Sequence, residues 1–315
     1  MMTARQNHAR VITRHPQFGY TGLDRTSLTR LSVGAYARTA EWDALFVEGR
    51  LRTRAHAVAH RITNPRAAFW GASAAALHDL PVYRVAADRV DMVVPGRHTR
   101  RNSTDVVRHQ APLPETDVVI IGGVRVTSLD RTVYDVIRTR SLECAVVVFD
   151  AALRAQAWMG NTYEVEVAEA FRARVERRIR DNPGARGIRQ ARFVTSFADG
   201  RADRPGESIS RLWMWQLGAP DPELQYRVEF GDGTYALLDF AWPALGRWGE
   251  FDGTSKYSDA TMLAGRTAEQ VLESQRAREG RVRQATGWHP DRWGFAQMPT
   301  IDAFAEHLRK IGLIL

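Results

Sequence analysis

Three carboxylates near the end of the chain have the spacing expected for metal-dependent phosphate chemistry. Asp239 lies near the end of one expected strand, and Glu250 and Asp252 lie at the end of the next. Alternation along a strand places Glu250 and Asp252 on one face, and the short turn at 243–246 lets Asp239 meet Glu250 across the strand pair. Because like charges held this close destabilise a sheet, the pattern predicts a cation between them, either Mg²⁺ or Mn²⁺.

Lys256 follows these acids in the segment 253–257, and Lys256 and Lys310 are the chain's two lysines. A metal ion lowers the pKa of a bound water, and an ammonium group beside it can orient that water or stabilise the transition state. We therefore expect Asp239 and Glu250 to hold the metal, Asp252 to be a further ligand and Lys256 to assist catalysis. The alternative is a solvated acidic turn with a surface lysine.

Glu207, in the first turn of an expected helix, is a further candidate catalytic residue. An acid in this position stabilises a helix through the helix dipole, and it can also face a metal, so both interpretations stay open. Glu273, Arg276 and Glu279 lie near one face of a long expected helix. Surface ion pairs are the simplest interpretation of these three residues, and a contact of one of them with the site is the alternative.

The elements that must position these residues follow from apolar periodicity and from the Gly and Pro positions. In the C-terminal part we expect a helix at 207–217, strands at 224–230, 235–242 and 247–251, a helix at 267–286, a strand at 293–297 and a helix at 301–311. Further upstream we expect strands at 28–37, 89–94, 105–109, 117–121 and 124–126, and helices at 40–62, 74–78, 129–138 and 142–156. The fold class is therefore mixed α/β.

Between these two parts, residues 170–192 carry eight arginines against Glu176 and Asp181. We interpret residues 166–200 as a basic helical connector. Its arginines can track a phosphate backbone, and a solvated face is the equally weighted alternative. The arginines expected to contact nucleic acid are Arg172, Arg174, Arg177, Arg178, Arg186 and Arg189.

Composition agrees with a polyanionic partner. The 315-residue chain has a formal net charge of +8, and its isoelectric point of about 10.1 suits DNA or RNA, with a basic soluble surface as the alternative. The single cysteine, Cys144, excludes an internal disulfide and a cysteine-based zinc site. The apolar run at 118–121 is far too short to span a bilayer, and the N-terminus lacks the apolar stretch of a signal peptide. We expect a cytoplasmic protein with no membrane partner.

Residues 201–315 resemble the PD-(D/E)XK nuclease superfamily, on the branch similar to very-short-patch repair endonucleases. The stretches that carry the resemblance are Ser-Arg at 210–211, Leu-Asp-Phe-Ala-Trp-Pro at 238–243, Gly-Glu-Phe-Asp-Gly at 249–253, Lys-Tyr at 256–257 and Thr-Gly-Trp at 286–288. The resemblance implies a restriction-endonuclease-like αβββαβ core and metal-dependent phosphodiester cleavage, with Asp239 and Glu250 as motif acids. Asp252 occupies the motif's lysine position, and Lys256 is a candidate replacement.

Residues 1–165 form the other expected domain, and within it residues 20–165 resemble the antitoxins of type IV, AbiE-type toxin–antitoxin systems. The matching stretches are Ser-Val-Gly-Ala-Tyr at 32–36, Ser-Ala-Ala-Ala-Leu-His at 73–78, Val-Val-Pro-Gly-Arg at 93–97 and Val-Thr-Ser-Leu-Asp-Arg-Thr-Val-Tyr-Asp at 126–135. The resemblance implies an N-terminal winged helix that binds DNA, which in this sequence looks shortened or missing, and it implies a toxin as partner. The leading hypothesis is a DNA endonuclease or nickase of defence or repair; the alternative is a non-catalytic DNA-binding regulator or antitoxin.

Overall fold

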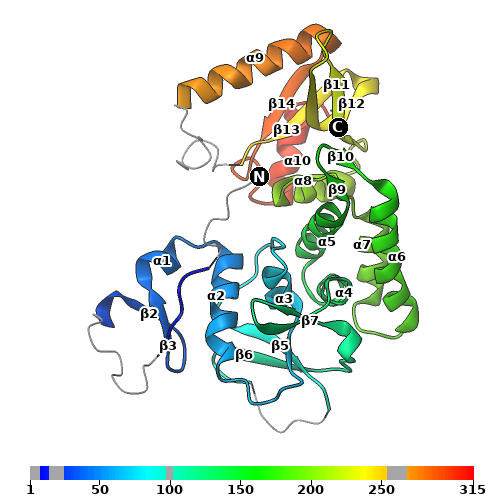
Figure 1. The fold of residues 1–315 in the computed structure, drawn as a ribbon. Coiled ribbons are helices and arrows are strands. Elements are labelled where there is room, and N and C mark those ends of the chain that lie inside the picture. Colours follow the sequence, from blue (N-terminus) through cyan, green and yellow to red (C-terminus); the bar gives the residue numbers. More distant parts are fainter. Residues whose placement is uncertain (1–7, 14–24, 97–101, 254–267) are drawn as a thin grey trace. The chain divides into compact units, whose positions relative to one another are not determined.

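Helices and strands are mixed along the whole chain, which confirms the expected α/β class (Figure 1). The computed structural model describes residues 8–13, 25–96, 102–253 and 268–315. The chain divides into two compact units, Met1–Ala198 and Asp199–Leu315. Among the helices in these described ranges, none combines the length and the apolar character needed to cross a membrane.

The first unit begins with a three-stranded antiparallel sheet in the order β1-β3-β2. Gly34 adopts a positive φ of 75° between the last two strands, so the expected single strand at 28–37 is a hairpin. The expected helix at 40–62 is two helices, because the chain is extended at Phe46. The elements are β1 (Ile12–Thr13), η1 (Arg25–Ser27), β2 (Leu28–Ser32), β3 (Ala35–Arg38), α1 (Thr39–Asp43) and α2 (Val47–Ala59).

A five-stranded mixed sheet in the order β6-β5-β4-β8-β7 follows. Its β5–β6 and β4–β8 pairs are parallel, and its β4–β5 and β7–β8 pairs are antiparallel. The helix expected at 74–78 begins at Gly71, so Ser73 lies inside it, and Ser73 Oγ accepts from the Asp91 N–H at 2.9 Å. The elements are β4 (Ala68–Phe69), α3 (Gly71–Leu77), β5 (Val90–Val94), β6 (Val106–Gln110), η2 (Glu115–Asp117), β7 (Val118–Ile121) and β8 (Val124–Thr127).

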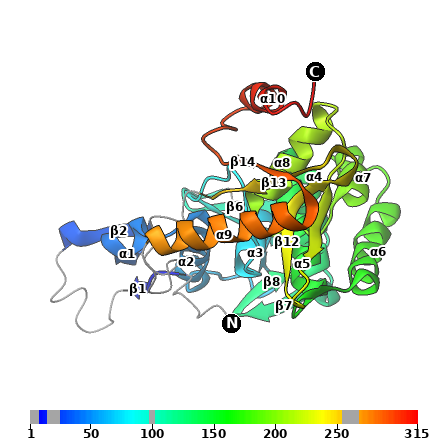
Figure 2. The same cartoon turned by 90° about the horizontal axis from the view of Figure 1, so that it is seen from above.

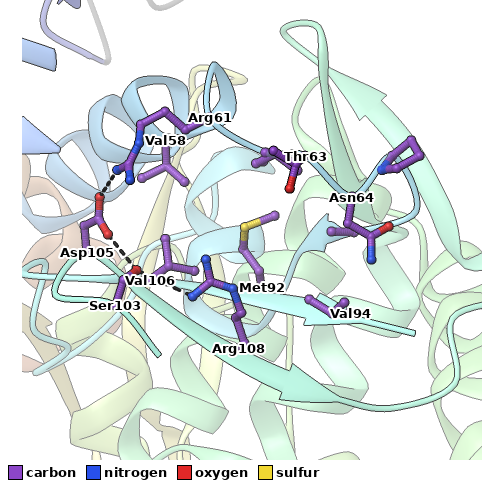
Figure 3. Close-up of a pocket in the computed structure, with 13 residues that line it drawn as sticks. Val58, Arg61, Thr63, Asn64, Met92, Val94, Ser103, Asp105, Val106 and Arg108 are labelled. Carbon is purple, nitrogen blue, oxygen red and sulfur yellow. Dashed lines mark hydrogen bonds and ion pairs between the residues drawn. The ribbon is translucent and has the colours of Figure 1, made fainter. Parts of the chain in front are cut away.

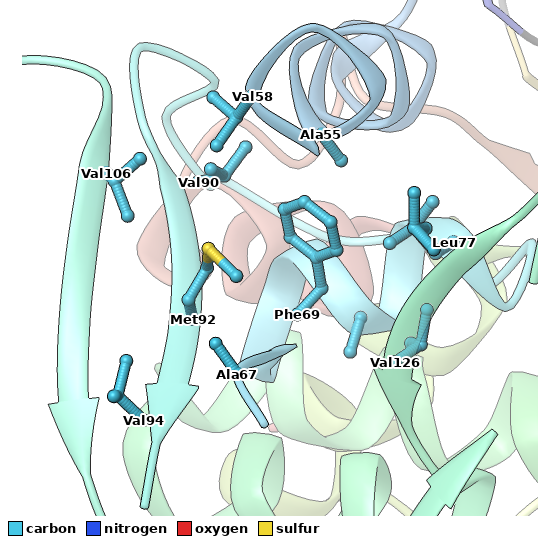
Figure 4. Close-up of a cluster of buried hydrophobic side chains, with 12 residues drawn as sticks. Ala55, Val58, Ala67, Phe69, Leu77, Val90, Met92, Val94, Val106 and Val126 are labelled. Atoms are coloured by element: carbon cyan, nitrogen blue, oxygen red, sulfur yellow. The ribbon is translucent and has the colours of Figure 1, made fainter. Parts of the chain in front are cut away.

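One face of this sheet carries the core shown in Figure 4. Val58 of α2 and Leu77 of α3 pack against Phe69, Met92 and Val126 of the strands. Val90, Met92 and Val94 alternate along β5 and all join this cluster, as the period of a strand requires. The apolar area removed from water in this layer stabilises the sheet beneath the two helices.

The residues expected to form a connector are instead helices packed in the first unit. Helix α6 buries Ala168, Phe171, Val175 and Ile179, spaced three or four residues apart, as in a helix with one apolar face against a core. That face packs on α4 and α5, and α7 packs there as well. The boundary between the two units therefore lies after α7, at Ala198. The elements are α4 (Leu129–Thr139), α5 (Leu142–Ala157), β9 (Trp158–Met159), β10 (Thr162–Tyr163), α6 (Val165–Asp181) and α7 (Ile188–Phe197).

The segment at 126–135 builds a buried ion network. Arg131 lies between Asp117 and Asp135, with N···O distances of 2.7 Å to each. Arg178 of α6 contacts Asp117 and Asp130 at 2.6 Å each. Arg131 and Asp135 form an i,i+4 pair within α4, and the network joins α4, α6 and the segment before β7.

The second unit contains its elements in the expected order: helix, three strands, helix, strand, helix. The last strand lies four residues before the predicted one, because the chain turns at Gly294, where an added Cβ would be 2.4 Å from the Asp252 carbonyl oxygen. The elements are α8 (Pro205–Gln216), β11 (Glu223–Glu229), β12 (Tyr235–Trp242), η3 (Pro243–Leu245), β13 (Arg247–Phe251), α9 (Ala268–Thr286), β14 (His289–Trp293) and α10 (Ile301–Lys310), seen in Figure 1 and Figure 2.

The sheet of this unit runs in the order β11-β12-β13-β14, with its last pair parallel and the others antiparallel. Trp248 faces α9 and packs with Val282. On the other face, Phe251 packs so closely on Gly206 of α8 that a Cβ there would lie 2.1 Å from its ring. Trp293 packs on Phe304 of α10, with ring centroids 5.9 Å apart. Helices therefore cover both faces of the sheet.

Candidate active site

Asp239 lies where β12 departs from regular strand geometry. Leu238 packs with Trp248 on the α9 side, whereas Phe240 packs against Trp293 on the other side. Residues two apart in a regular strand share a face, so β12 changes face at Asp239. On the neighbouring strand, Gln225 has a φ of 50°, which is uncommon for a residue other than glycine and recurs at functional sites.

This change of face turns the Asp239 carboxylate toward β13 and α8. Asp239 Oδ2 accepts a hydrogen bond from the Phe251 backbone N–H at 3.0 Å. Glu207 of α8 is 2% exposed, and its carboxylate accepts from the Asp203 backbone N–H at 2.8 Å. Burial, together with the negative charge of Asp239, raises the pKa of Glu207 well above its usual range. Glu207 and Asp239 thus form a close pair of carboxylates that favours a shared proton or cation.

Glu250 and Asp252 lie on one side of β13, where arginines contact them. Arg292 of β14 places Nη2 2.7 Å from Glu250 Oε2 and Nη1 2.9 Å from Asp252 Oδ2. Arg278 of α9 forms an ion pair with the other oxygen of Glu250. Glu250 is 5% exposed, so this is a buried carboxylate whose charge is balanced by two guanidinium groups.

The structure therefore brings Asp239 together with Glu207, and it directs Glu250 toward Arg278 and Arg292. We expected Asp239 and Glu250 to bind one cation together, but the change of face in β12 turns Asp239 toward α8 instead. Simple alternation of side chains along a strand could not predict this change. Within the described residues, no group of three or more His, Cys, Asp and Glu side chains is arranged to hold a metal ion. Lys256 lies outside the described residues.

Arg278 and Arg292 are the functional candidates that sequence reasoning missed. Glu279, interpreted from the sequence as part of a surface pair, contacts Arg292 at 2.7 Å. A signal was present, because Arg278 and Glu279 stand four and three residues before Val282, the buried residue that marks the inner face of α9. The side of α9 that faces the sheet was therefore accessible from the sequence, but the partners of its charged residues were not.

Two of the arginines expected to contact nucleic acid are engaged within the first unit. Arg172 donates to the Ala198 carbonyl oxygen at 2.9 Å and also to that of Thr195. Arg178 belongs to the buried ion network. Both occupy inward positions of α6 and contribute to its packing, so the candidate nucleic-acid surface contains fewer arginines than expected. Its exposed members are Arg174, Arg177, Arg186 and Arg189.

No protein-family model matches the chain. It is 32% identical over 148 residues to an uncharacterized protein of Mycobacterium tuberculosis, strain CDC 1551 / Oshkosh. The same identity and length hold for an uncharacterized protein of strain ATCC 25618 / H37Rv. In each case the match covers 47% of this chain and 50% of the relative, so the chain spans about half the length of the curated relatives it matches.

Proposed function

We propose that this protein is a divalent-metal-dependent endonuclease or nickase that acts on nucleic acid, most simply DNA, in defence or repair. The observation that carries the proposal is the pair formed by Glu207 and Asp239, in which burial and the neighbouring charge raise the pKa of Glu207. The repulsion between two like charges costs stability, and a ligand of opposite charge at this pair would offset it. The order of the second unit's elements and the PD-(D/E)XK-like motifs support the same function.

The residues present fit a hard cation, because carboxylate oxygens are the ligands that Mg²⁺ and Mn²⁺ prefer. Asp239 and Glu207 would hold the ion, and Glu250 and Asp252 would join it only by exchanging an arginine contact for the metal. When bound, the ion would activate a water and shield the charge of a phosphodiester. Without it, burial and the charge of Asp239 disfavour the ionised form of Glu207 by raising its pKa.

The arginines around Glu250 supply a second part of the proposed chemistry. A guanidinium group can bind phosphate oxygens through two parallel N–H donors. Glu250 holds Arg278 and Arg292 in place on the α9 side of the sheet, and there they would bind a further phosphate of the nucleic acid. Lys256 keeps its proposed role as an assisting ammonium group, and the exposed arginines of α6, of α7 and of the turn between them would hold the nucleic-acid backbone.

The test is cleavage of a supercoiled plasmid by the purified full chain with Mg²⁺ or Mn²⁺. We expect nicked or linear product, and we expect Asp239→Asn and Glu207→Gln to lower the rate by about 100-fold or more. Asp232→Asn is the matched control, because it makes the same charge change in the exposed β11–β12 hairpin of the same unit. Cleavage that survives in Asp239→Asn, or that never requires a divalent cation, would contradict the proposal.

The second candidate function is a DNA-binding regulator, or the antitoxin of a type IV toxin–antitoxin system. The observation that favours it is the balanced charge of Glu250, which two arginines already neutralise without a metal. This function predicts salt-sensitive binding to duplex DNA with no cleavage under either metal. Copurification of a toxin encoded beside it would add support. For either function the proposed location is the cytoplasm.

A further inference from the structure

The first unit contains a pocket of about 530 Å³ that is separate from the carboxylate site. It lies between the C-terminal end of α2, the segment that leads to β4, and strands β5 and β6. Figure 3 shows Arg61, Asp105 and Ser103 on one side and Asn64 on the other, with Met92 and Arg108 between them. The volume falls within the range typical of small-molecule sites.

The floor of the pocket is the open end of the hydrophobic core. Val58, Met92, Val94 and Val106 line the pocket, and the same side chains belong to the buried cluster between α2 and the sheet (Figure 3, Figure 4). Ile62, at the end of the α2 region, packs against that cluster and lines the pocket too. An apolar group placed here would extend the core and be removed from water, which favours binding.

The polar side of the pocket is organised around one carboxylate. Asp105 accepts from Ser103 Oγ at 2.7 Å and lies 2.8 Å from Arg61 Nη1. Burial acts to raise the pKa of Asp105, but hydrogen bonds from Ser32 and Ser103 and the charge of Arg61 hold it below its usual value. Asp105 is therefore ionised at neutral pH and is already satisfied by its neighbours.

Arg108 brings a second guanidinium group to the pocket, where its Nη1 lies 3.5 Å from Ser103 Oγ. The described lining thus holds two arginines against one aspartate, a net charge of +1. A cationic side above an apolar floor is complementary to a ligand with one negative charge and a hydrocarbon body. A carboxylate suits a guanidinium group best, because it can accept two parallel hydrogen bonds.

We propose that this pocket binds a small amphiphilic carboxylate, with its apolar body on Val58, Met92 and Val106 and its carboxylate at Arg108 and Arg61. The proposal rests on the first unit alone and does not depend on the nuclease function. A bound ligand would contact both α2 and the β5–β6 edge of the sheet. Because only the folded unit has the pocket, a bound ligand also raises its thermal stability.

The experiment is calorimetric titration of the full chain with decanoate, and with decanol as the uncharged analogue. We expect saturable binding of one decanoate, at least about tenfold weaker binding of decanol, and a rise in Tm of roughly 5 °C at a 100-fold excess over Kd. Binding of both compounds with equal affinity, or no saturable binding of decanoate, would overturn the proposal.

Variants separate the two parts of the pocket. Arg108→Gln should weaken decanoate about tenfold and leave decanol unchanged, and Arg108→Lys should give an intermediate affinity because it keeps the charge but not the paired donors. Val94→Phe fills the floor and should abolish both, with circular dichroism to show that the unit is folded. Arg192→Gln, an exposed arginine of α7, is the matched control. An equal loss of decanoate affinity in this control would show non-specific electrostatic attraction and contradict the proposal.

Discussion

Both units bury carboxylates, but they neutralise them differently. In the first unit, Asp117 and Asp135 are contacted by Arg131, and further arginines from α4 and α6 reach the same acids. In the second unit, Glu207 faces another carboxylate, Asp239, and accepts a hydrogen bond from the backbone N–H of Asp203. The same kind of group is thus contacted by arginines in one unit and faces a second carboxylate in the other.

The difference appears in the directions of the pKa shifts. Although burial acts to raise it, hydrogen bonds from Arg178 and Arg131 hold the pKa of Asp117 below its usual value. Burial and the charge of Asp239 raise the pKa of Glu207. An acid that faces arginines therefore contributes to the fold, and an acid that faces an acid marks the better candidate for ligand binding. By this criterion Glu250 resembles the acids of the first unit, because Arg278 and Arg292 contact it.

The largest expected effect comes from breaking the buried ion network. Asp135→Asn leaves Arg131 and Arg138 without a fully buried partner, and we expect the free energy of unfolding of the first unit to fall by about 3–5 kcal/mol. Guanidinium denaturation followed by circular dichroism measures it. The control is Glu176→Gln, which removes the half-exposed partner of Arg180 and should change stability by about 0.5 kcal/mol or less. Equal losses of unfolding free energy in the two variants would show that the buried ion network contributes no more than an exposed ion pair.

The next effect separates Glu250 from Asp239. Glu250→Gln weakens the ion pairs with Arg278 and Arg292, and we expect a loss of about 1.5–3 kcal/mol, the usual contribution of hydrogen bonds to charged groups. Asp239→Asn relieves the repulsion from Glu207 and should leave the second unit as stable or more stable. Tryptophan fluorescence reports this unit, because six of the nine tryptophans lie in it. A large loss of stability in Asp239→Asn would mean that this acid is structural.

A pH titration of stability should show opposite slopes for the two acids. Since the folded-state pKa of Glu207 is raised, its contribution is complete below its ordinary value of 4.5 and is lost as the pH rises through the folded-state pKa. The contribution of Asp117 is present above its ordinary value of 3.8 and is lost as the pH falls through its lowered pKa. Tm measured from acid to neutral pH in the wild type, Glu207→Gln and Asp117→Asn tests both. Equal slopes in the wild type and Glu207→Gln would refute the shift.

The smallest effects are expected on the basic surface of α6 and α7. Replacing Arg174, Arg177, Arg186 or Arg189 singly by Gln should weaken DNA binding without regard to sequence and reduce the salt-dependence slope by about 1 for each phosphate that is no longer neutralised. Arg227→Gln, at an exposed position of β11, is the matched control. Fluorescence anisotropy at several salt concentrations gives the slope, and a slope that none of the four changes would place the nucleic-acid surface elsewhere.

Sequence patterns predicted most of the elements but not the roles of their charged residues. Apolar periodicity and the Gly and Pro positions predicted the order of the second unit, whose last strand alone was displaced by four residues. The arginine-rich segment looked like a connector because charge dominated its composition, yet Phe171, Val175 and Ile179 form a buried stripe along it. A few apolar residues at helical spacing decide burial even when charged residues outnumber them.

The sequence by itself determined the mixed α/β class and the order of elements around the acids, because these depend on neighbours within a few residues. Only the tertiary structure decided that Glu207 faces Asp239, that Arg278 and Arg292 reach Glu250, and that Arg178 turns inward. Local periodicity defines which face of an element a residue occupies. The partner on that face comes from a distant part of the chain, and here it decides whether the pKa of a buried acid is raised or lowered.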